Sequence, residues 1–130
     1  MKPKKILIAE DDKLIRKAYV SALTAAGFAV ITAENGRTAL ELISKEKPDL
    51  VLLDVVMPEK NGFEVAAEIK RKKWNIAVVI TSNLGQDADI KKGRELGVRD
   101  YLLKSNFSAK DLIKKVHRYF NAVPRPAAKK

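Results

Sequence analysis

Short apolar runs alternate along the chain with longer stretches in which apolar residues recur every three or four positions. The apolar runs read "KKILIAE", "FAVITA", "LVLLD", "IAVVIT" and "DYLLK". Their length and aliphatic content are typical of strands buried on both faces. The stretches that follow them have helical periodicity and read "DKLIRKAYVSALTAAG", "RTALELISKEK", "NGFEVAAEIKRKK", "QDADIKKGRELG" and "SAKDLIKKVHRYF". Five strand–helix units in strict alternation predict an α/β protein with a parallel sheet between two layers of helices.

The helical stretches also predict where each helix stops and which residues face the core. Gly27 and Gly97 are natural C-terminal stops, and Pro48 prevents the second helix from continuing. Asp12 and Ser108 are suited to cap the first and last helices. The expected inner face of the first helix consists of Leu14, Ile15, Ala18, Tyr19 and Ala22.

The composition predicts one globular domain. The chain has 130 residues, of which 46% are hydrophobic and 32% charged. No apolar segment approaches the roughly 20 residues that a bilayer-spanning helix needs, and there is no cysteine for a disulfide or a thiolate metal site. We therefore expect a cytoplasmic protein without membrane contact. Residues 1–121 are assigned to the domain, and residues 122–130, "AVPRPAAKK", to a basic proline-containing tail or a truncated linker.

The net charge of +10 permits contact with nucleic acid or another acidic partner. The lysines, however, are dispersed over "KPKK", "KRKK", "IKKGR", "LIKKVHR" and "AAKK". Only 6% of the residues are aromatic, and no nucleic-acid recognition motif is present. A solvated basic surface is therefore favoured over a nucleic-acid reader. His117, among lysines on the last helix, is expected to be a surface residue.

Asp54 ends the buried run "LVLLD", where an ionised carboxylate is costly. Glu10 and Asp11 directly follow the first run, and Asp12 is better explained as a helix cap. If the second strand lies outside the first, strands one and three are neighbours, and Glu10, Asp11 and Asp54 surround one pocket. Two carboxylates ~5 Å apart repel by ~3 kcal/mol at an effective dielectric near 20. A hard divalent cation such as Mg²⁺ would offset this repulsion, so the sequence predicts an acidic metal pocket.

Two further strand ends bring groups that suit a phosphoryl ligand. Ser82 comes just after the fourth apolar run, and Lys104 closes the fifth. A hydroxyl and an ammonium that converge on a carboxylate–metal cluster match the oxygens of a phosphoryl group.

The motifs "ILIAEDD", "LVLLDVVMPEKNGFEV", "VVITSN", "LGQDADIKKGRELG" and "DYLLK" occur in the order and spacing of a known family. From Lys4 to Phe120 the chain resembles a CheY-like response-regulator receiver domain of two-component signalling. The resemblance implies a doubly wound, flavodoxin-like (βα)5 fold with strand order 2-1-3-4-5. It also implies a phosphorylated signalling switch rather than a turnover enzyme.

The resemblance implies a role for each site residue. Asp54 would accept a phosphoryl group from a sensor histidine kinase, a phosphotransfer protein or a small phosphodonor. Phosphorylation would change the surface of the fourth helix, fifth strand and fifth helix, which a downstream protein or an effector domain would read. The roles implied for the other residues are Mg²⁺ binding by Glu10, Asp11 and the Val56 carbonyl, phosphoryl contacts by Ser82 and Lys104, and an activation switch at Tyr101 and Ser82.

The chain departs from the family pattern at four positions near this site. Ser105 replaces the usual proline after the lysine, and Asn83 replaces a small residue. A cis peptide bond before serine costs roughly 3 kcal/mol, so this bond is expected to be trans or strained. Val56 and Leu84 place apolar bulk beside the site, and we expect them to limit water access and slow dephosphorylation.

Two other classes of function fit the sequence less well. A magnesium-dependent phosphohydrolase with an aspartyl-phosphate intermediate usually has a second acid two residues after its nucleophile, where this chain has Val56. The dispersed charge argues against a nucleic-acid-binding module. We expect a monomer that dimerises at most upon phosphorylation, and either a stand-alone receiver or one separated from an output domain.

Overall fold

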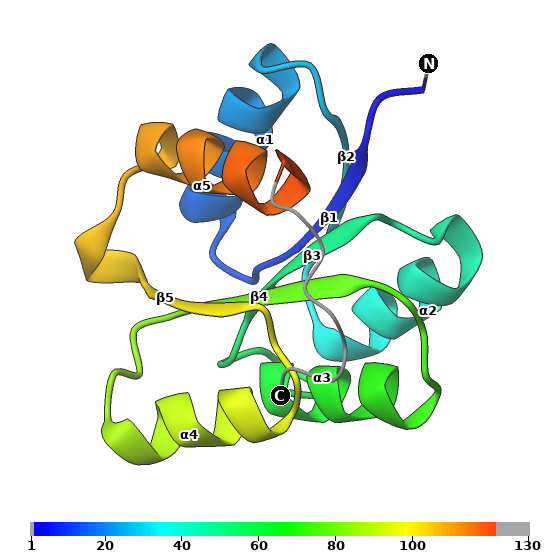
Figure 1. Ribbon diagram of the computed structural model, residues 1–130, viewed down its shortest axis with the longest axis vertical. Helices are drawn as coiled ribbons and strands as arrows, with labels where there is room; N and C mark the ends of the chain where they lie inside the picture. Colours follow the sequence, from blue (N-terminus) through cyan, green and yellow to red (C-terminus); the bar gives the residue numbers. More distant parts are fainter. Residues whose placement is uncertain (1, 122–130) are drawn as a thin grey trace.

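The computed structural model describes residues 2–121 and confirms the doubly wound α/β fold (Figure 1). The strands are β1 (Lys5–Ala9), β2 (Ala29–Ala33), β3 (Leu50–Asp54), β4 (Ala77–Ser82) and β5 (Asp100–Leu103). The helices are α1 (Lys13–Ala25), α2 (Gly36–Glu46), α3 (Gly62–Arg71), α4 (Asp87–Glu95) and α5 (Ala109–Asn121), with a short 3-10 turn, η1 (Lys104–Asn106), after β5. The predicted tail at 122–130 lies outside the described residues.

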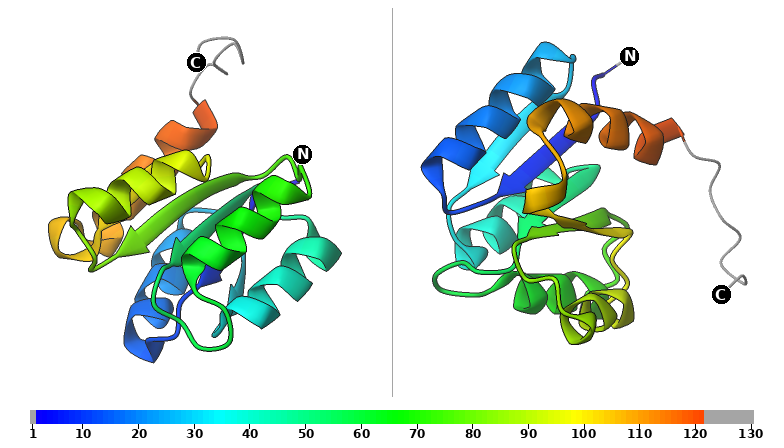
Figure 2. Two further views of the ribbon diagram at one scale, coloured as in Figure 1. Left: turned by 90° about the horizontal axis from the view of Figure 1, so that it is seen from below. Right: turned by 90° about the vertical axis from the view of Figure 1, so that its left-hand side faces the viewer.

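All strand pairs are parallel, and the sheet order is β2-β1-β3-β4-β5, as expected. Helices α1 and α5 cover one face of the sheet, and α2, α3 and α4 cover the other (Figure 2). The chain reverses direction across the sheet between β1 and β3, because β2 lies on one side of β1 and β4 lies beyond β3. Ligands of such sheets bind outside the carboxyl ends of the strands at this point.

Alternation along the central strands builds two separate cores. In β1, Ile6 and Ile8 pack in the core beneath α1 and α5, whereas Leu7 and Ala9 pack in the core above α2 and α3. All five residues of β3 are buried, which confirms the prediction of a strand covered on both faces. Burial on both faces fixes the position of the strand that carries Asp54.

The predicted helix ends are confirmed within one or two residues. The Asp12 carboxylate accepts a hydrogen bond from the Ile15 N–H at 3.0 Å and caps α1. Ser108 Oγ accepts from the Asp111 N–H at 3.1 Å, and the Asp111 carboxylate accepts from the Ser108 N–H at 3.0 Å. Gly27, just beyond α1, has φ +98°, a left-handed conformation that favours glycine.

The predicted inner face of α1 is partly wrong. Leu14 is 79% exposed, and Ala18 is also exposed. The face that reaches the core is instead Ile15, Tyr19 and Leu23, which are spaced four residues apart. Helix α1 packs mainly against one helix, α5, so a narrower stripe of it is covered than the prediction assumed.

Candidate functional site

The site residues are brought together by the ends of the central strands. Glu10 follows β1, and Asp54 is the last residue of β3. In the register of these strands Ala9 lies opposite Leu53, so Glu10 and Asp54 emerge side by side at the same edge of the sheet. Ser82 is the last residue of β4 rather than the first residue after it, a shift of one position from the prediction.

Glu10, Asp11 and Asp54 form an acidic cluster. Each of the three residues offers a carboxylate oxygen that lies within 4.8 Å of the other two. Glu10 and Asp54 are buried, and Asp11 is exposed, so the cluster opens to solvent on one side. A pocket of about 200 Å³ lies over these acids, and Val56, Asn83 and Lys104 also line it. This set of hard oxygen donors fits a divalent cation of the Mg²⁺ type.

Lys104 supplies the positive charge at the centre of this cluster. Its Nζ lies 2.7 Å from Glu10 Oε1 and 3.2 Å from Asp54 Oδ2, and its side chain is 9% exposed. Glu10 Oε1 has no well-directed hydrogen bond, so its partner is the ammonium charge. Burial lowers the pKa of Lys104, but contact with Glu10 and the charge of Asp54 outweigh this effect and hold the pKa above its ordinary value.

The pKa of the Glu10 carboxyl is raised from 4.5 to about 7, mainly by burial. Lys104 lowers this pKa, and the charge of Asp54 raises it further. Glu10 Oε2 accepts a hydrogen bond from the Asp12 N–H at 3.1 Å. The backbone carbonyl of Glu10 accepts from Arg16 Nη1 at 2.8 Å. Arg16 was not predicted as a site residue. An arginine one turn into a helix that follows three consecutive acids is the signal that could have indicated it.

The backbone around Asp54 is tightly packed. The Gly62 N–H donates to the Val55 carbonyl at 2.8 Å. A Cβ at position 62 would collide with the carbonyl oxygen of Asp54 and lie 2.9 Å from the Val55 Cα, so only glycine fits at the start of α3. Val56, two residues after Asp54, is 61% exposed at the mouth of the pocket.

Leu84 links Ser82 and Tyr101. The Leu84 N–H donates to Ser82 Oγ at 2.9 Å, and the Tyr101 hydroxyl donates to the Leu84 carbonyl at 2.6 Å. Ser82 is fully buried, whereas Tyr101 is half-buried and packs against Gly93 of α4. Burial raises the pKa of Tyr101, so its hydroxyl stays protonated and able to donate. The loop after β4 is therefore held at Leu84 by both residues expected to act as a switch.

Two of the departures expected from the sequence, Ser105 and Asn83, lie in the loops after β5 and β4. Ser105 is exposed within η1, and no peptide bond within residues 2–121 is cis. Asn83 is exposed and lines the pocket. His117 is exposed, as predicted.

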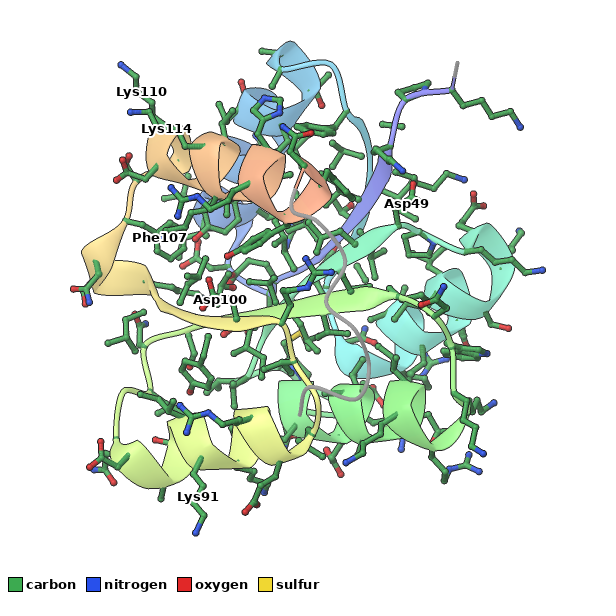
Figure 3. The ribbon with its side chains drawn as sticks, in the orientation of Figure 1. Asp49, Lys91, Asp100, Phe107, Lys110 and Lys114 are labelled. Carbon is green, nitrogen blue, oxygen red and sulfur yellow. The ribbon has the colours of Figure 1, made fainter. Side chains whose placement is uncertain are left out.

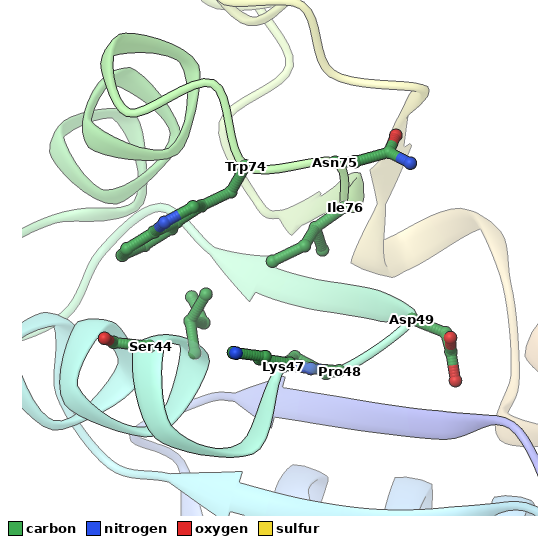
Figure 4. A pocket seen from close by; sticks show the side chains of 8 residues that line it. Ser44, Lys47, Pro48, Asp49, Trp74, Asn75 and Ile76 are labelled. Carbon is green, nitrogen blue, oxygen red and sulfur yellow. The ribbon is translucent and has the colours of Figure 1, made fainter.

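A second hollow, of about 250 Å³, lies at the opposite edge of the sheet, between the end of α2 and the segment before β4 (Figure 4). Trp74 and Lys47 lie on its walls, and Asp49 points away from it. The Asp49 carboxylate instead accepts from the Lys5 N–H at 2.8 Å. This hollow lacks the paired acids that the first pocket has.

The fold and the site together define a doubly wound parallel α/β domain with a carboxylate–lysine centre at the carboxyl edge of its sheet. Residues 6–117 match the family model described as the response regulator receiver domain. The chain therefore belongs to the response regulator receiver domain family of two-component systems.

Sequence relatives and solved structures agree with this family. The "Probable transcriptional regulator ycf27" of Galdieria sulphuraria is 45% identical over 108 residues, which cover 83% of this chain and 42% of that protein. The chain spans about half the length of the curated relatives it matches. A DNA-binding response regulator of the LuxR family from Staphylococcus aureus has a TM-score of 0.86 at 32% identity, covering 91% of this chain and 99% of that one. The Mn²⁺-bound form of response regulator Rcp1 has a TM-score of 0.81 at 29% identity, covering 96% and 100%.

Within residues 2–121, none of the helices combines the length and the apolar composition needed to cross a bilayer.

Proposed function

We propose that Asp54 accepts a phosphoryl group from a phosphohistidine of a sensor kinase or phosphotransfer protein. The observation that carries this proposal is the position of Asp54, which lies at the pocket with the Lys104 ammonium 3.2 Å away and two further acids beside it. An Asp54 carboxylate oxygen would attack phosphorus, and the bond from phosphorus to the imidazole nitrogen would break. The imidazole would keep the electron pair and take up a proton. Lys104 would offset the charge of the phosphoryl oxygens.

The carboxylates of Glu10, Asp11 and Asp54, with the backbone carbonyl of Val56, would hold Mg²⁺. When bound, the cation would neutralise charge on the transferring phosphoryl group. The donor set supports this assignment, because three carboxylates in one pocket exceed the charge that Lys104 alone can offset. A structural relative, Rcp1, is described as Mn²⁺-bound.

The phosphoryl group would act on the rest of the domain through the loop after β4. Ser82 Oγ accepts from Leu84 in the described state, and in the switched state its hydroxyl would donate to a phosphoryl oxygen. That rotation would move the Leu84 peptide, whose carbonyl is the hydrogen-bond acceptor of Tyr101. Tyr101 would then lose this acceptor and be free to change its rotamer, which would change the surface of α4, β5 and α5.

The domain would serve as a switch and not as a turnover enzyme. A phosphohydrolase would need a general acid–base near Asp54, and Val56 occupies the position two residues on, with an apolar side chain at the pocket mouth. Val56 and Leu84 would also restrict the approach of water to the phosphorylated aspartate. In a Val56→Asn variant the phosphoryl half-life is expected to be shorter, as measured by intact mass over time. A half-life equal to or longer than that of the parent would contradict this role.

The readout of the switch would be a downstream protein or a linked effector domain. Curated relatives that are about twice as long are described as transcriptional regulators. We propose that the protein is cytoplasmic. Before phosphorylation it would be a monomer, because the basic residues of α5 would repel a second copy.

The test is intact-mass measurement after incubation with Mg²⁺ and acetyl phosphate. The parent protein should gain one phosphoryl group, and Asp54→Asn should gain none. Asp49→Asn, at the opposite edge of the sheet, is the matched control and should react like the parent. No gain in the parent, or an equal gain in Asp54→Asn, would overturn the assignment of Asp54.

A further inference from the structure

The charge of the domain is divided unequally between its two helix layers. Helices α2 and α3 each carry two basic and two acidic residues, and α4 carries three of each. Helix α1 carries three basic residues and no acid, and α5 carries four basic residues and one acid. The layer of α1 and α5 therefore has an excess of six positive charges, whereas the opposite layer has none. We call this layer's cations the basic face: Lys13, Arg16, Lys17, Lys110, Lys114, Lys115 and Arg118.

The lysines of the basic face are available to a partner. Figure 3 shows Lys110 and Lys114 extending from α5 away from the sheet, and Lys91 extending from α4 on the other side. Within residues 2–121, none of the lysines of α1 or α5 forms an ion pair. The one acid of α5, Asp111, is engaged in the cap with Ser108.

A hollow of about 520 Å³ lies along the outer side of α1, beside β2. Its lining residues are Lys13, Arg16, Lys17, Val20, Ser21 and Thr32. Three cations and two hydroxyl donors can surround a carboxylate, which accepts hydrogen bonds only. Among the described residues, the one ion contact of this group is to Glu34, whose exposed carboxylate lies 3.9 Å from Arg16 Nη2.

We propose that the basic face docks an acidic segment of a partner protein and that the hollow beside α1 takes one of its carboxylates. A polypeptide fits better than a nucleic acid for two reasons. The aromatic rings beneath this face, such as Tyr19 with Phe107 and Phe28 with Phe120, pack against one another and leave no stacking platform. Leu14, one turn before Lys17 and Ala18 on α1, is 79% exposed. Its apolar side chain can be covered by a protein surface but not by a phosphate backbone. The docking needs no phosphorylation of Asp54.

The test compares two variants with the same net charge. Lys17→Glu/Lys114→Glu reverses charge on α1 and α5, and Lys45→Glu/Lys91→Glu makes the same change on α2 and α4, where both lysines are exposed. The probe is a fluorescein-labelled peptide of repeated Glu-Glu-Leu units, and its Kd is measured by fluorescence anisotropy. A duplex DNA and phosphatidylglycerol vesicles serve as alternative probes, and thermal unfolding checks that both variants fold.

We expect the first variant to bind the peptide roughly tenfold more weakly than the parent and the control variant to stay within about twofold. When the peptide is added to the parent protein, the NMR chemical shifts of backbone amides should change in α1 and α5. Equal weakening in both variants, or no binding of the peptide, would overturn the proposal. Tighter binding of DNA or of vesicles through the same two lysines would overturn the choice of a protein partner.

Discussion

Replacing Lys104 by methionine removes the ammonium between two buried carboxylates and leaves an unbranched side chain that is one heavy atom shorter. Nζ lies 2.7 Å from Glu10 Oε1 and 3.2 Å from Asp54 Oδ2. At an effective dielectric near 20, each contact is worth roughly 5–6 kcal/mol of attraction, from which the desolvation of the charged groups is subtracted. Removing one partner of a buried pair typically costs about 3–5 kcal/mol. We therefore expect Lys104→Met to lower the free energy of unfolding by about 3–5 kcal/mol at about pH 8 without metal.

The loss should depend on pH, because the pKa of Glu10 is raised to about 7. Below this pH Glu10 binds a proton, so one of the two unpaired charges left in Lys104→Met disappears and the loss becomes smaller. Urea unfolding in EDTA, monitored by circular dichroism at several pH values, measures this loss of unfolding free energy. The matched control is Lys5→Met, which removes an ion contact of 3.2 Å between Lys5 and Glu46. The side chains of this pair are 35% and 34% exposed, so its loss should cost at most about 1 kcal/mol. Equal losses in both variants, or a loss in Lys104→Met that does not vary with pH, would refute the reasoning.

Two further predictions concern the same edge of the sheet. In EDTA the free energy of unfolding of the parent protein should fall by up to about 3 kcal/mol as the pH rises from 4.5 through about 7. The reason is that the pKa of Glu10 is raised in the folded state, so Glu10 stabilises the fold only while it keeps its proton. A free energy of unfolding from urea titrations that does not vary with pH would contradict this. Gly62→Ala should cost about 1–3 kcal/mol and slow phosphorylation by acetyl phosphate, because its Cβ would collide with the Asp54 carbonyl. Gly85→Ala is the matched control, because its Cβ would contact only the flexible side chain of Leu103, at 3.0 Å or more. Equal shifts of Tm in the two variants would count against this view.

The local pattern of the chain was sufficient to predict the architecture and most of the site. Apolar runs with helical stretches between them admit few arrangements other than a parallel sheet covered on both faces. The carboxyl ends of parallel strands share one edge, so the residues that end those runs had to meet there. For this reason Glu10, Asp54, Ser82 and Lys104 could be grouped before any distance was known, although their chemical roles are still proposals.

Contacts that depend on which side of an element faces its neighbour could not be predicted. Helix α1 was expected to bury Leu14, and it buries Leu23 instead, because the helical period alone does not say how wide a stripe the neighbouring helix covers. The link through Leu84 depends on side-chain directions that no spacing reveals.

The same distinction applies to charge. The sequence by itself determined that the protein is basic and that its lysines are spread over many segments. Only the tertiary structure decided that α1 and α5, at opposite ends of the chain, lie together on one face while the other three helices balance their charges. The physical reason is that right-handed connections in opposite directions along the sheet lie on opposite faces, so α1 is separated from α2, α3 and α4. Helix α5 follows the last strand and packs against α1.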